Sequence, residues 1–421
     1  MLTAVVGINW GDEGKGRMVD LLSADYDIVC RYQGGNNAGH TVINDYGKIV
    51  LNLLPSGISR EGTVNVMGNG MVIDLEHLVH EIQSLREKGI HIGPDNLKIS
   101  DKAVICLPWH KMQDIMEEDR LKDKKFGSTR RGIGPVYADK YMKKAIRLGD
   151  LFAPDKLPEK VADLTEWKNL TVRGYGHEPV KAEDILAWLH EFGDPIKPYI
   201  TDVSDYLYDA ATAGENIMFE AQLGALRDIE FGIYPYTSSS CTLAGYATIG
   251  AGIPGLKLDK TIGIMKAYSS CVGEGPFAVE MFGDEAEALR RAGGEYGAAT
   301  GRPRRVGAFD IPASRYGVRM HGADCIALTK MDVLSYMDKI PVCVAYDING
   351  EITEKFPVGE RLNAAKPVFE YMEGFGDISG CRKPEDLPKA AMDYIRYLEA
   401  AVGCKIKYVS VGAGRDEYVE L

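Results

Sequence analysis

A segment near the N-terminus combines glycines, a lysine and two acidic residues in a spacing suited to phosphate binding. It reads GINWGDEGKGR over residues 7–17, follows a short apolar run and precedes a helical pattern. Glycines let backbone N–H groups approach phosphate oxygens, while a helix N-terminus and a lysine supply positive charge. The common G-x-x-x-x-G-K-[ST] loop is absent, because Gly16 follows Lys15 where a hydroxyl would bind Mg²⁺. Asp12 and Glu13 would repel phosphates unless one of them binds a metal ion or acts as a base.

A second glycine-rich segment, RYQGGNNAGHT at residues 31–41, also follows an apolar run. Loops that leave neighbouring strand ends can face each other across one phosphate site. Either segment alone leaves open an ordinary strand–helix turn with solvated charges, because glycine-loop matches have many false positives. The pair together favours a phosphate site shared by the two loops.

Short apolar runs alternate with helical patterns along the chain, which predicts an α/β fold with a mostly parallel central sheet flanked by helices. Long glycine-rich segments also indicate functional loops, and the charged, motif-poor segment at about 150–181 is interpreted as a surface insertion in a single domain spanning 1–421. We expect strands at residues 2–8, 27–32, 64–67, 216–219, 261–267, 325–329, 342–346 and 407–411. We expect helices at residues 14–22, 75–88, 110–121, 182–191, 200–213 and 385–401.

The composition limits the classes of partner. The 421 residues carry a formal net charge of -12, which disfavours nucleic acid because binding its phosphates needs a basic surface. The first apolar run is too short for a signal peptide and no stretch has the apolar length of a membrane span, so we expect a cytoplasmic protein. The eight cysteines are scattered without metal-ligand spacing, which indicates reduced thiols.

The two glycine-rich segments resemble the first two signatures of the adenylosuccinate synthetase family. The resemblance continues through TRRGIGP at 129–135, TGRPRR at 300–305, LTKMD at 328–332 and SVG at 410–412. It implies a P-loop-NTPase-like fold and a GTP-dependent ligase that converts IMP and L-aspartate to adenylosuccinate through 6-phosphoryl-IMP, in AMP biosynthesis. It also implies one Mg²⁺ ion per subunit and a homodimer with the site near the interface.

The family's chemistry assigns roles to residues of the two loops. A base removes the N1 proton of IMP, the 6-oxygen attacks the γ-phosphate of GTP, and the amine of aspartate then displaces the phosphate from C6. By resemblance, Asp12 is the base and a Mg²⁺ ligand, tasks that suit a carboxylate because Mg²⁺ prefers hard oxygen ligands. The Gly39 carbonyl matches the second protein ligand, and His40 matches the acid that stabilises the transferring phosphoryl group. Lys15 would neutralise the β- and γ-phosphates.

The T-K-x-D pattern that contains Lys330 and Asp332 would select guanine. A carboxylate can accept hydrogen bonds from guanine N1–H and the exocyclic amine, and the lysine stem can cover the ring face. Adenine presents no such donor pair, so GTP would be preferred over ATP. The pattern alone is more often a solvated strand end, and the resemblance to the family raises it above that alternative.

Three arginines, Arg302, Arg304 and Arg305, lie within four residues of a glycine-flanked loop in an acidic chain. This density indicates a local anion site, because guanidinium groups bind carboxylates bidentately. A solvated basic patch is the alternative. By resemblance, the loop 298–304 closes over the aspartate substrate, with Arg302 reaching aspartate or IMP and Arg304 also touching the nucleotide.

The resemblance implies three sets of contacts. For GTP they are Gly11, Glu13, Gly14, Lys15, Gly16, Arg17, Gly39, Thr41, Arg304, Lys330, Met331, Asp332, Ser410, Val411 and Gly412. For IMP they are Asp12, Lys15, Asn37, Ala38, His40, Thr129, Lys143, Gln222, Leu223, Ser238 and Arg302. For aspartate they are Ala298, Ala299, Thr300, Gly301, Arg302 and Arg304.

Several positions depart from the family pattern on the IMP and aspartate side. Gln222 stands one residue early and Leu223 occupies the family's glutamine position, so the slip turns the amide in another direction. Lys143 replaces an arginine that crosses the dimer interface to the IMP phosphate, and it lacks the bidentate fork. The other departures are Ser238 for threonine, Cys271 for arginine and Ala299 for threonine.

These departures leave open a ligase of the same loop type that acts on a variant purine nucleotide or amine donor. A GTP-binding switch without ligase activity is disfavoured, because a switch needs no arginine clamp for a carboxylate. A hydride-transfer enzyme is weaker still, because no G-x-G-x-x-G segment opens a βαβ unit.

Overall fold

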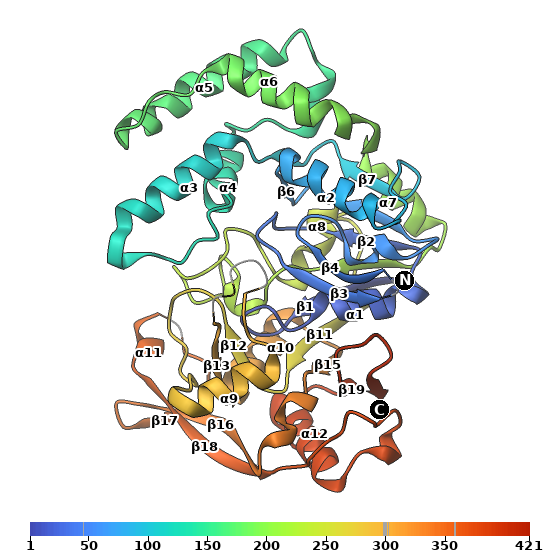
Figure 1. Cartoon of the computed structure of the whole chain (residues 1–421), viewed down its shortest axis with the longest axis vertical. Coiled ribbons are helices and arrows are strands. Elements are labelled where there is room, and N and C mark those ends of the chain that lie inside the picture. The colour runs from blue at the N-terminus through green and yellow to red at the C-terminus, as the bar shows by residue number, and fades with distance from the viewer. Residues whose placement is uncertain (45, 298–300, 302, 358) are drawn as a thin grey trace.

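A ten-stranded sheet runs through the middle of the molecule (Figure 1). The computed structural model describes residues 1–421 except residues 45, 298–300, 302 and 358. Neighbouring strands are parallel except β19 and β20, so the predicted, mostly parallel sheet is confirmed. In spatial order the strands are β20 (Tyr418–Glu420), β19 (Ile406–Ser410), β15 (Cys325–Thr329), β11 (Lys260–Lys266), β1 (Leu2–Gly7), β10 (Ile217–Glu220), β2 (Ile28–Arg31), β5 (Val64–Met67), β7 (Leu97–Ser100) and β9 (Ile200–Thr201).

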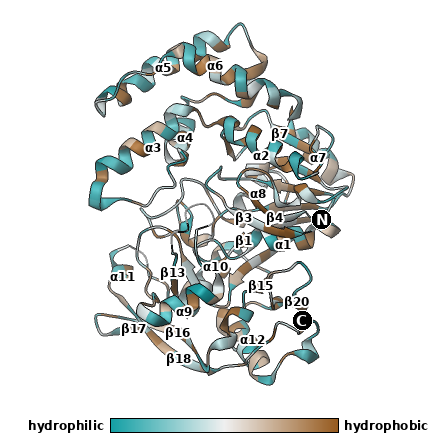
Figure 2. Ribbon diagram, in the orientation of Figure 1, coloured by the Kyte–Doolittle hydropathy of each residue, from teal (hydrophilic) through white to brown (hydrophobic). Residues whose placement is uncertain are grey.

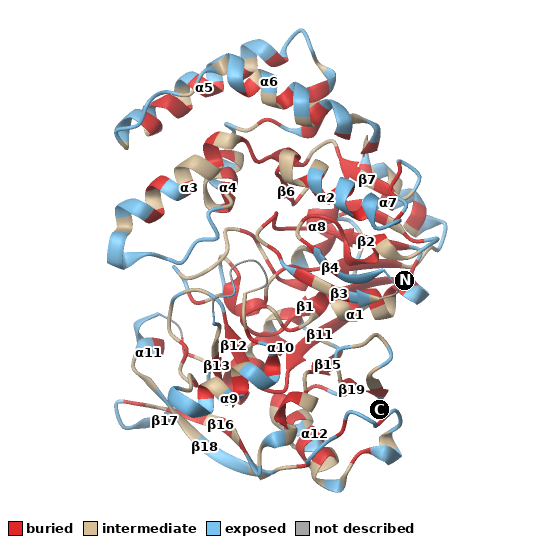
Figure 3. Ribbon diagram, viewed as in Figure 1, coloured by how far each residue is buried: buried red, intermediate tan, exposed pale blue. Residues whose placement is uncertain are grey.

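The central strands are buried because helices cover both faces of the sheet (Figures 2 and 3). Successive side chains of a strand point to opposite faces. In β1, Val6 packs in a cluster with Leu207 of α7 (Val203–Thr212), whereas Val5 packs in another cluster with Val19 of α1 (Lys15–Leu22). The helices are α1 (Lys15–Leu22), α2 (Leu75–Glu87), α3 (Pro108–Leu121), α4 (Ile133–Tyr141), α5 (Leu157–Gly174), α6 (Ala182–Gly193), α7 (Val203–Thr212), α8 (Ala247–Ala251), α9 (Gly283–Gly293), α10 (Ile311–His321), α11 (Glu360–Asn363) and α12 (Lys389–Val402).

The strand predicted at 342–346 forms, but not in the parallel sheet. It lies within β16 (Lys339–Ile348). This strand pairs antiparallel with β17 (Glu351–Thr353) and β18 (Ala365–Glu373), and parallel with β14 (Phe309–Asp310). Val342 and Tyr346 of this strand are fully buried, so the apolar run predicts burial correctly but does not determine the partner strand. Outside the central sheet lie β3 (His40–Asn44), β4 (Gly47–Leu51), β6 (Val72–Ile73), β8 (Val104–Ile105), β12 (Ser269–Cys271), β13 (Arg305–Gly307), β14 (Phe309–Asp310), β16 (Lys339–Ile348), β17 (Glu351–Thr353) and β18 (Ala365–Glu373).

Two helices begin later than predicted for local reasons. Helix α7 begins at Val203 rather than at residue 200, because Asp202 caps it by accepting hydrogen bonds from the N–H groups of Ser204 and Asp205. Helix α12 begins at Lys389 rather than at residue 385. Pro388 precedes its first residue, and proline has no backbone N–H to contribute inside a helix.

The motif-poor segment 150–181 contains α5, which lies at the periphery of the molecule beside α6 (Figure 1). Leu157 and Val161 of α5 join the buried cluster that includes Leu189 of α6. Its charged residues therefore form the outer face of an amphipathic helix. The interpretation of the segment as an insertion stays a prediction. Among the described residues, no helix is both long and apolar enough to cross a membrane.

Candidate active site

Glu13 holds the loop between β1 and α1 in shape. Gly11 and Asp12 adopt positive φ angles of 100° and 58°, which turn the loop around the buried Glu13 carboxylate. Its Oε1 accepts hydrogen bonds from the N–H groups of Asn9 at 3.1 Å and Gly11 at 2.8 Å. Its Oε2 pairs with Lys15 Nζ at 2.6 Å. The repulsion expected between Glu13 and a phosphate is therefore relieved, because this carboxylate is neutralised by Lys15 and bonded to the loop.

The two glycine-rich segments meet at Gly16. A Cβ on Gly16 would lie 2.7 Å from the Cβ of His40, so only glycine lets the strand β3 pack this closely against α1. The loops also connect to β15, because the Thr329 hydroxyl donates to the Glu13 carbonyl at 2.6 Å. The two glycine-rich segments therefore converge because β3 packs directly against α1.

A buried carboxylate, Glu220, orients His40. It ends β10, and its Oε1 lies 2.5 Å from His40 Nδ1 while Oε2 accepts from the Ser56 N–H at 2.7 Å. Burial would raise the pKa of Glu220, but the charges of His40 and Arg31 bring it below its ordinary value. An ionised carboxylate at Nδ1 fixes the ring and its tautomer. We did not predict this contact. The position of Glu220 directly after the apolar run of the strand predicted at 216–219 could have indicated it.

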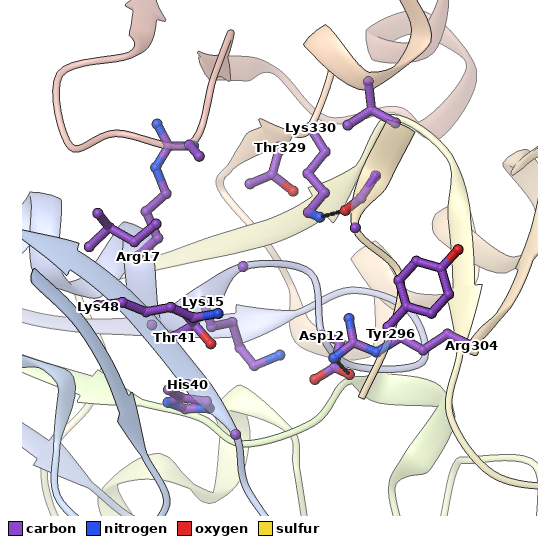
Figure 4. Close-up of a pocket in the computed structure, with 18 of the residues that line it drawn as sticks. Asp12, Lys15, Arg17, His40, Thr41, Lys48, Tyr296, Arg304, Thr329 and Lys330 are labelled. Atoms are coloured by element: carbon purple, nitrogen blue, oxygen red, sulfur yellow. Dashed lines mark hydrogen bonds and ion pairs between the residues drawn. The ribbon is translucent and has the colours of Figure 1, made fainter. Parts of the chain in front are cut away.

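Both loops open into one cavity of about 550 Å³ (Figure 4). That volume lies within the range of nucleotide-sized ligand sites. Lys48, Arg291 and Tyr296 also line the cavity, and the sequence had not predicted them. The predicted residues on its wall are Asp12, Gly14, Lys15, Gly16, Arg17, Asn37, Ala38, Gly39, His40, Thr41, Gln222, Leu223, Arg304, Lys330, Asp332 and Gly412.

Other predicted residues lie away from the described wall. Thr129 and Lys143 are exposed, and Ser238 is half-buried with its Oγ 3.3 Å from Ser240 Oγ. Gly301 is exposed, and its N–H donates to the Gly297 carbonyl. Five predicted GTP contacts are buried beside wall residues rather than on the wall: Gly11, Glu13, Met331, Ser410 and Val411. Four predicted positions lie outside the described residues: Ala298, Ala299, Thr300 and Arg302.

Arg304 enters the cavity, whereas Arg305 does not. Arg304 Nη2 lies 3.0 Å from Asp12 Oδ2 (Figure 4), and Nη1 lies 2.9 Å from Glu295 Oε2. Arg305 Nε instead contacts both carboxylate oxygens of Glu280 at 2.9 Å. Consecutive side chains of extended backbone point to opposite faces, so the two guanidinium groups diverge. The expectation that Arg305 belongs to the same anion site is therefore wrong.

The wall of the cavity also includes Asp332, which has an unsatisfied carboxylate oxygen. Asp332 Oδ1 is buried and has no hydrogen-bond partner among the described residues. Burial raises the pKa of Asp332 above its ordinary value. Nearby, Lys330 Nζ donates to the Gly293 carbonyl at 2.5 Å, which ties the ammonium group to one edge and lays the aliphatic stem along the wall. A buried acceptor beside an apolar stem suits a planar base that carries N–H donors.

Arg17 lines the cavity, but its guanidinium group bonds to the C-terminal loop of the protein. It donates to the Ser410 hydroxyl and to the carbonyls of Gly412 at 2.6 Å, Gly414 at 2.6 Å and Glu417 at 3.0 Å. Four hydrogen bonds from one side chain therefore fix the C-terminal loop against α1. The loop presents Gly412 to the cavity.

Because of the slip at residues 222–223, the side-chain amide of Gln222 is buried and bonded to protein groups. Gln222 Oε1 accepts from Arg31 Nη2 at 2.8 Å and from the Gly35 N–H at 3.1 Å, while Nε2 donates to Asn37 Oδ1 at 2.5 Å. Gln222 is buried and bonded through both ends of its amide. Leu223, with φ of 63°, presents an apolar side chain to the cavity instead.

Asp12 and Gly39 provide candidate metal ligands. The Asp12 side chain is 31% exposed, Gly39 is exposed, and both line the cavity. No cluster of three or more His, Cys, Asp and Glu suited to a metal ion occurs in the described part of the chain. Mg²⁺ commonly binds one or two protein oxygens together with phosphate oxygens and water. A carboxylate and a carbonyl beside a phosphate site fit that preference.

A family model and three known proteins that are similar to this chain carry the description adenylosuccinate synthetase. A family model described as "Adenylosuccinate synthetase" matches residues 4–419. The chain is 44% identical to adenylosuccinate synthetase of Caldanaerobacter subterraneus, over 100% of this chain and 99% of the relative, and 43% identical to that of Streptococcus gordonii, over 98% and 96%. A fully ligated adenylosuccinate synthetase from Plasmodium falciparum superimposes with a TM-score of 0.92 at 36% identity, covering 100% of this chain and 99% of that one. This chain belongs to the adenylosuccinate synthetase family.

Proposed function

We propose that this protein converts IMP and L-aspartate to adenylosuccinate, with GTP as phosphoryl donor and 6-phosphoryl-IMP as intermediate. Membership of the family supports this reaction. The observation that carries it is one cavity whose wall includes Asp12, His40 and Asp332, the last with an oxygen that has no partner in the described structure. A base, an oriented imidazole and a guanine acceptor are the three groups that the first step needs.

In the first step Asp12 accepts the N1 proton of IMP, and the 6-oxygen attacks the γ-phosphorus of GTP. The bond from that phosphorus to the β–γ bridging oxygen breaks, and GDP leaves. His40, oriented by Glu220, donates a hydrogen bond to the transferring phosphoryl group. Lys15 adds positive charge there after its ammonium group leaves Glu13, with which it is paired at 2.6 Å. Asp12 must first leave Arg304, with which it is paired at 3.0 Å.

In the second step the amine of aspartate attacks C6, and phosphate leaves. Arg304 lines the cavity and already pairs with a carboxylate there, that of Asp12, so we assign it to a carboxylate of aspartate. Asp12 and the Gly39 carbonyl would hold Mg²⁺, which would screen the negative charge of the phosphates. The remaining aspartate contacts, at 298–300 and 302, rest on the sequence resemblance.

We further propose a homodimer in which the exposed Lys143, just beyond α4, serves the neighbouring subunit's IMP phosphate. A cytoplasmic location is supported by the cysteines, all eight of which are free. Light scattering measures the mass of the assembly and so tests the dimer. A complementation assay, in which the Lys143→Ala and Asp12→Asn variants are mixed, tests whether the site is shared. Mixing two inactive variants should restore activity only if sites are completed across subunits.

The reaction is tested with the purified chain, GTP, MgCl₂, IMP and L-aspartate, measuring adenylosuccinate and GDP by chromatography. We expect equal amounts of both products and none when any substrate is omitted. Replacement of IMP by other purine nucleotides, and of aspartate by other amines, completes the panel. Turnover of another pair without turnover of IMP and aspartate would contradict the proposal.

A further inference from the structure

One buried carboxylate, Glu295, lies behind the wall of the cavity and joins four segments of the chain. It is fully buried and follows α9. Its Oε1 lies 2.7 Å from Lys266 Nζ, 2.5 Å from the Tyr268 hydroxyl and 3.6 Å from Lys330 Nζ. Its Oε2 lies 2.9 Å from Arg304 Nη1. Two of its partners, Arg304 and Lys330, also line the cavity. We assign Arg304 to aspartate and Lys330 to guanine.

Charge balance alone does not explain this arrangement. Lys266 is 3% exposed, so this one cation would neutralise Glu295 in the protein interior. Arg304 and Lys330 are 20% and 34% exposed and could turn towards the solvent of the cavity. Burial would raise the pKa of Glu295, but Lys266, Lys330 and Arg304 hold it well below its usual range. The Glu295 carboxylate therefore stays charged and attracts both Arg304 and Lys330.

The contacts determine where each cavity side chain can lie. Lys330 has a positive φ of 56°, and its ammonium group is fixed between the Gly293 carbonyl and Glu295. Its stem consequently has little freedom along the guanine end of the wall. Arg304 is held twice by Glu295, because its N–H also donates to the Glu295 carbonyl at 2.9 Å. The second guanidinium nitrogen then points to Asp12.

We propose that Glu295 is a positioning residue for the ligase, and that its one carboxylate fixes both the lysine beside the guanine ring and the arginine beside the aspartate carboxylate. This inference rests on the proposed function. Glu295 itself touches no substrate. Its loss should therefore impair recognition of aspartate and of guanine together, while recognition of IMP, which neither residue governs, is preserved.

The test is Glu295→Gln, with steady-state kinetics for each substrate. The amide keeps the shape but loses the charge, and its N–H₂ must face a donor on one side. We expect the KM for aspartate to rise about tenfold and the preference for GTP over ATP in kcat/KM to fall about tenfold, since misplacement by ~1 Å can cost up to 10²-fold. The KM for IMP should change less than about twofold. The matched control is Tyr268→Phe, which removes a hydrogen bond to the same carboxylate and leaves Arg304 and Lys330 untouched.

A second readout and a second variant keep the outcome decisive. Calorimetric affinities for GDP and ADP report guanine selectivity without turnover, so a wild-type protein that makes no adenylosuccinate would contradict the proposed function while the role of Glu295 is still measured. Thermal unfolding checks that the variants fold. If Glu295→Gln does not fold, Glu295→Asp keeps the charge but shortens the reach, and the same two losses are expected. Unchanged aspartate KM and unchanged selectivity, or equal effects in Tyr268→Phe, would overturn the inference.

Discussion

At the scale of residues, three carboxylates around the cavity differ in how much hydrogen-bonding capacity remains for a ligand. Glu13 is fully engaged by Lys15 and two loop N–H groups, and Glu220 by His40 and Ser56. Asp332 retains an oxygen with no partner in the described structure. Acidic residues of equal prominence in the sequence therefore have separate tasks, and only the contacts distinguish loop-building carboxylates from ligand-binding ones.

Asp12→Asn should lower kcat by at least about 100-fold, because an amide cannot accept the N1 proton and a positioned base contributes about 10²–10⁴-fold. GTP affinity, measured by calorimetry, should stay within about threefold if the nucleotide is held mainly by the loop and Lys15. Asp25→Asn serves as a control, because Asp25 is exposed in the turn that follows α1. A near-wild-type rate for Asp12→Asn would refute its role as base.

Asp332→Asn should reduce the preference for GTP over ATP by at least about tenfold. The carboxylate offers two acceptors to the two guanine donors, whereas the amide replaces one acceptor with a donor and leaves a buried mismatch. The measurement is kcat/KM for each nucleotide at fixed IMP and aspartate. An unchanged ratio would show that guanine is recognised elsewhere.

At the scale of elements, the strand runs and both glycine-rich segments could be predicted because continuous apolar runs and glycine spacing are local signals. The partner of β16 could not be predicted, since burial leaves the pairing undetermined. The divergence of Arg304 and Arg305 depends on the strand direction after the loop, and Glu295 is inconspicuous among charged neighbours. The sequence thus identified the cavity-lining loops better than the carboxylates that orient them.

Gly16→Ala should separate the two loops. The added methyl would meet the His40 Cβ at 2.7 Å, and neither the hairpin nor α1 can move without losing packing. We expect a loss of about 1–3 kcal/mol in the free energy of unfolding, a typical cost of overpacking, together with a lower kcat. Gly255→Ala is the control, because nothing lies within 4 Å of its added Cβ. Equal behaviour of the two variants in urea unfolding and in kcat would contradict the close approach of the loops.

At the scale of the whole molecule, His321 connects distant parts of the chain. Its Nε2–H donates to the Gly7 carbonyl at 2.9 Å, and Nδ1 accepts from the Ala244 N–H at 3.2 Å. These two bonds need the neutral ring. Burial lowers the pKa of His321 to about 4.

The folded protein should therefore lose stability as the pH falls. The pKa of His321 in the folded protein lies below its unfolded value near 6.5. The contribution of His321 to the free energy of unfolding is therefore fully present above pH ~6.5 and is lost progressively towards pH ~4, where the total loss is about 3 kcal/mol. Urea unfolding of wild type and His321→Gln at pH 7.5 and pH 5 measures it. The variant should depend less steeply on pH over this interval, and parallel pH dependences would exclude the histidine as a cause.

The place of β1 in the sheet has a consequence for how the protein is made. This strand is synthesised first, yet both of its neighbours, β10 and β11, begin only at Ile217 and Lys260. At ribosomal rates of about 5–20 residues per second, its backbone edges stay unpaired and its apolar side chains stay uncovered for ~10–50 s. Such long-range pairing slows folding and exposes strands that can aggregate. We expect the nascent chain to depend on chaperones until the second half emerges.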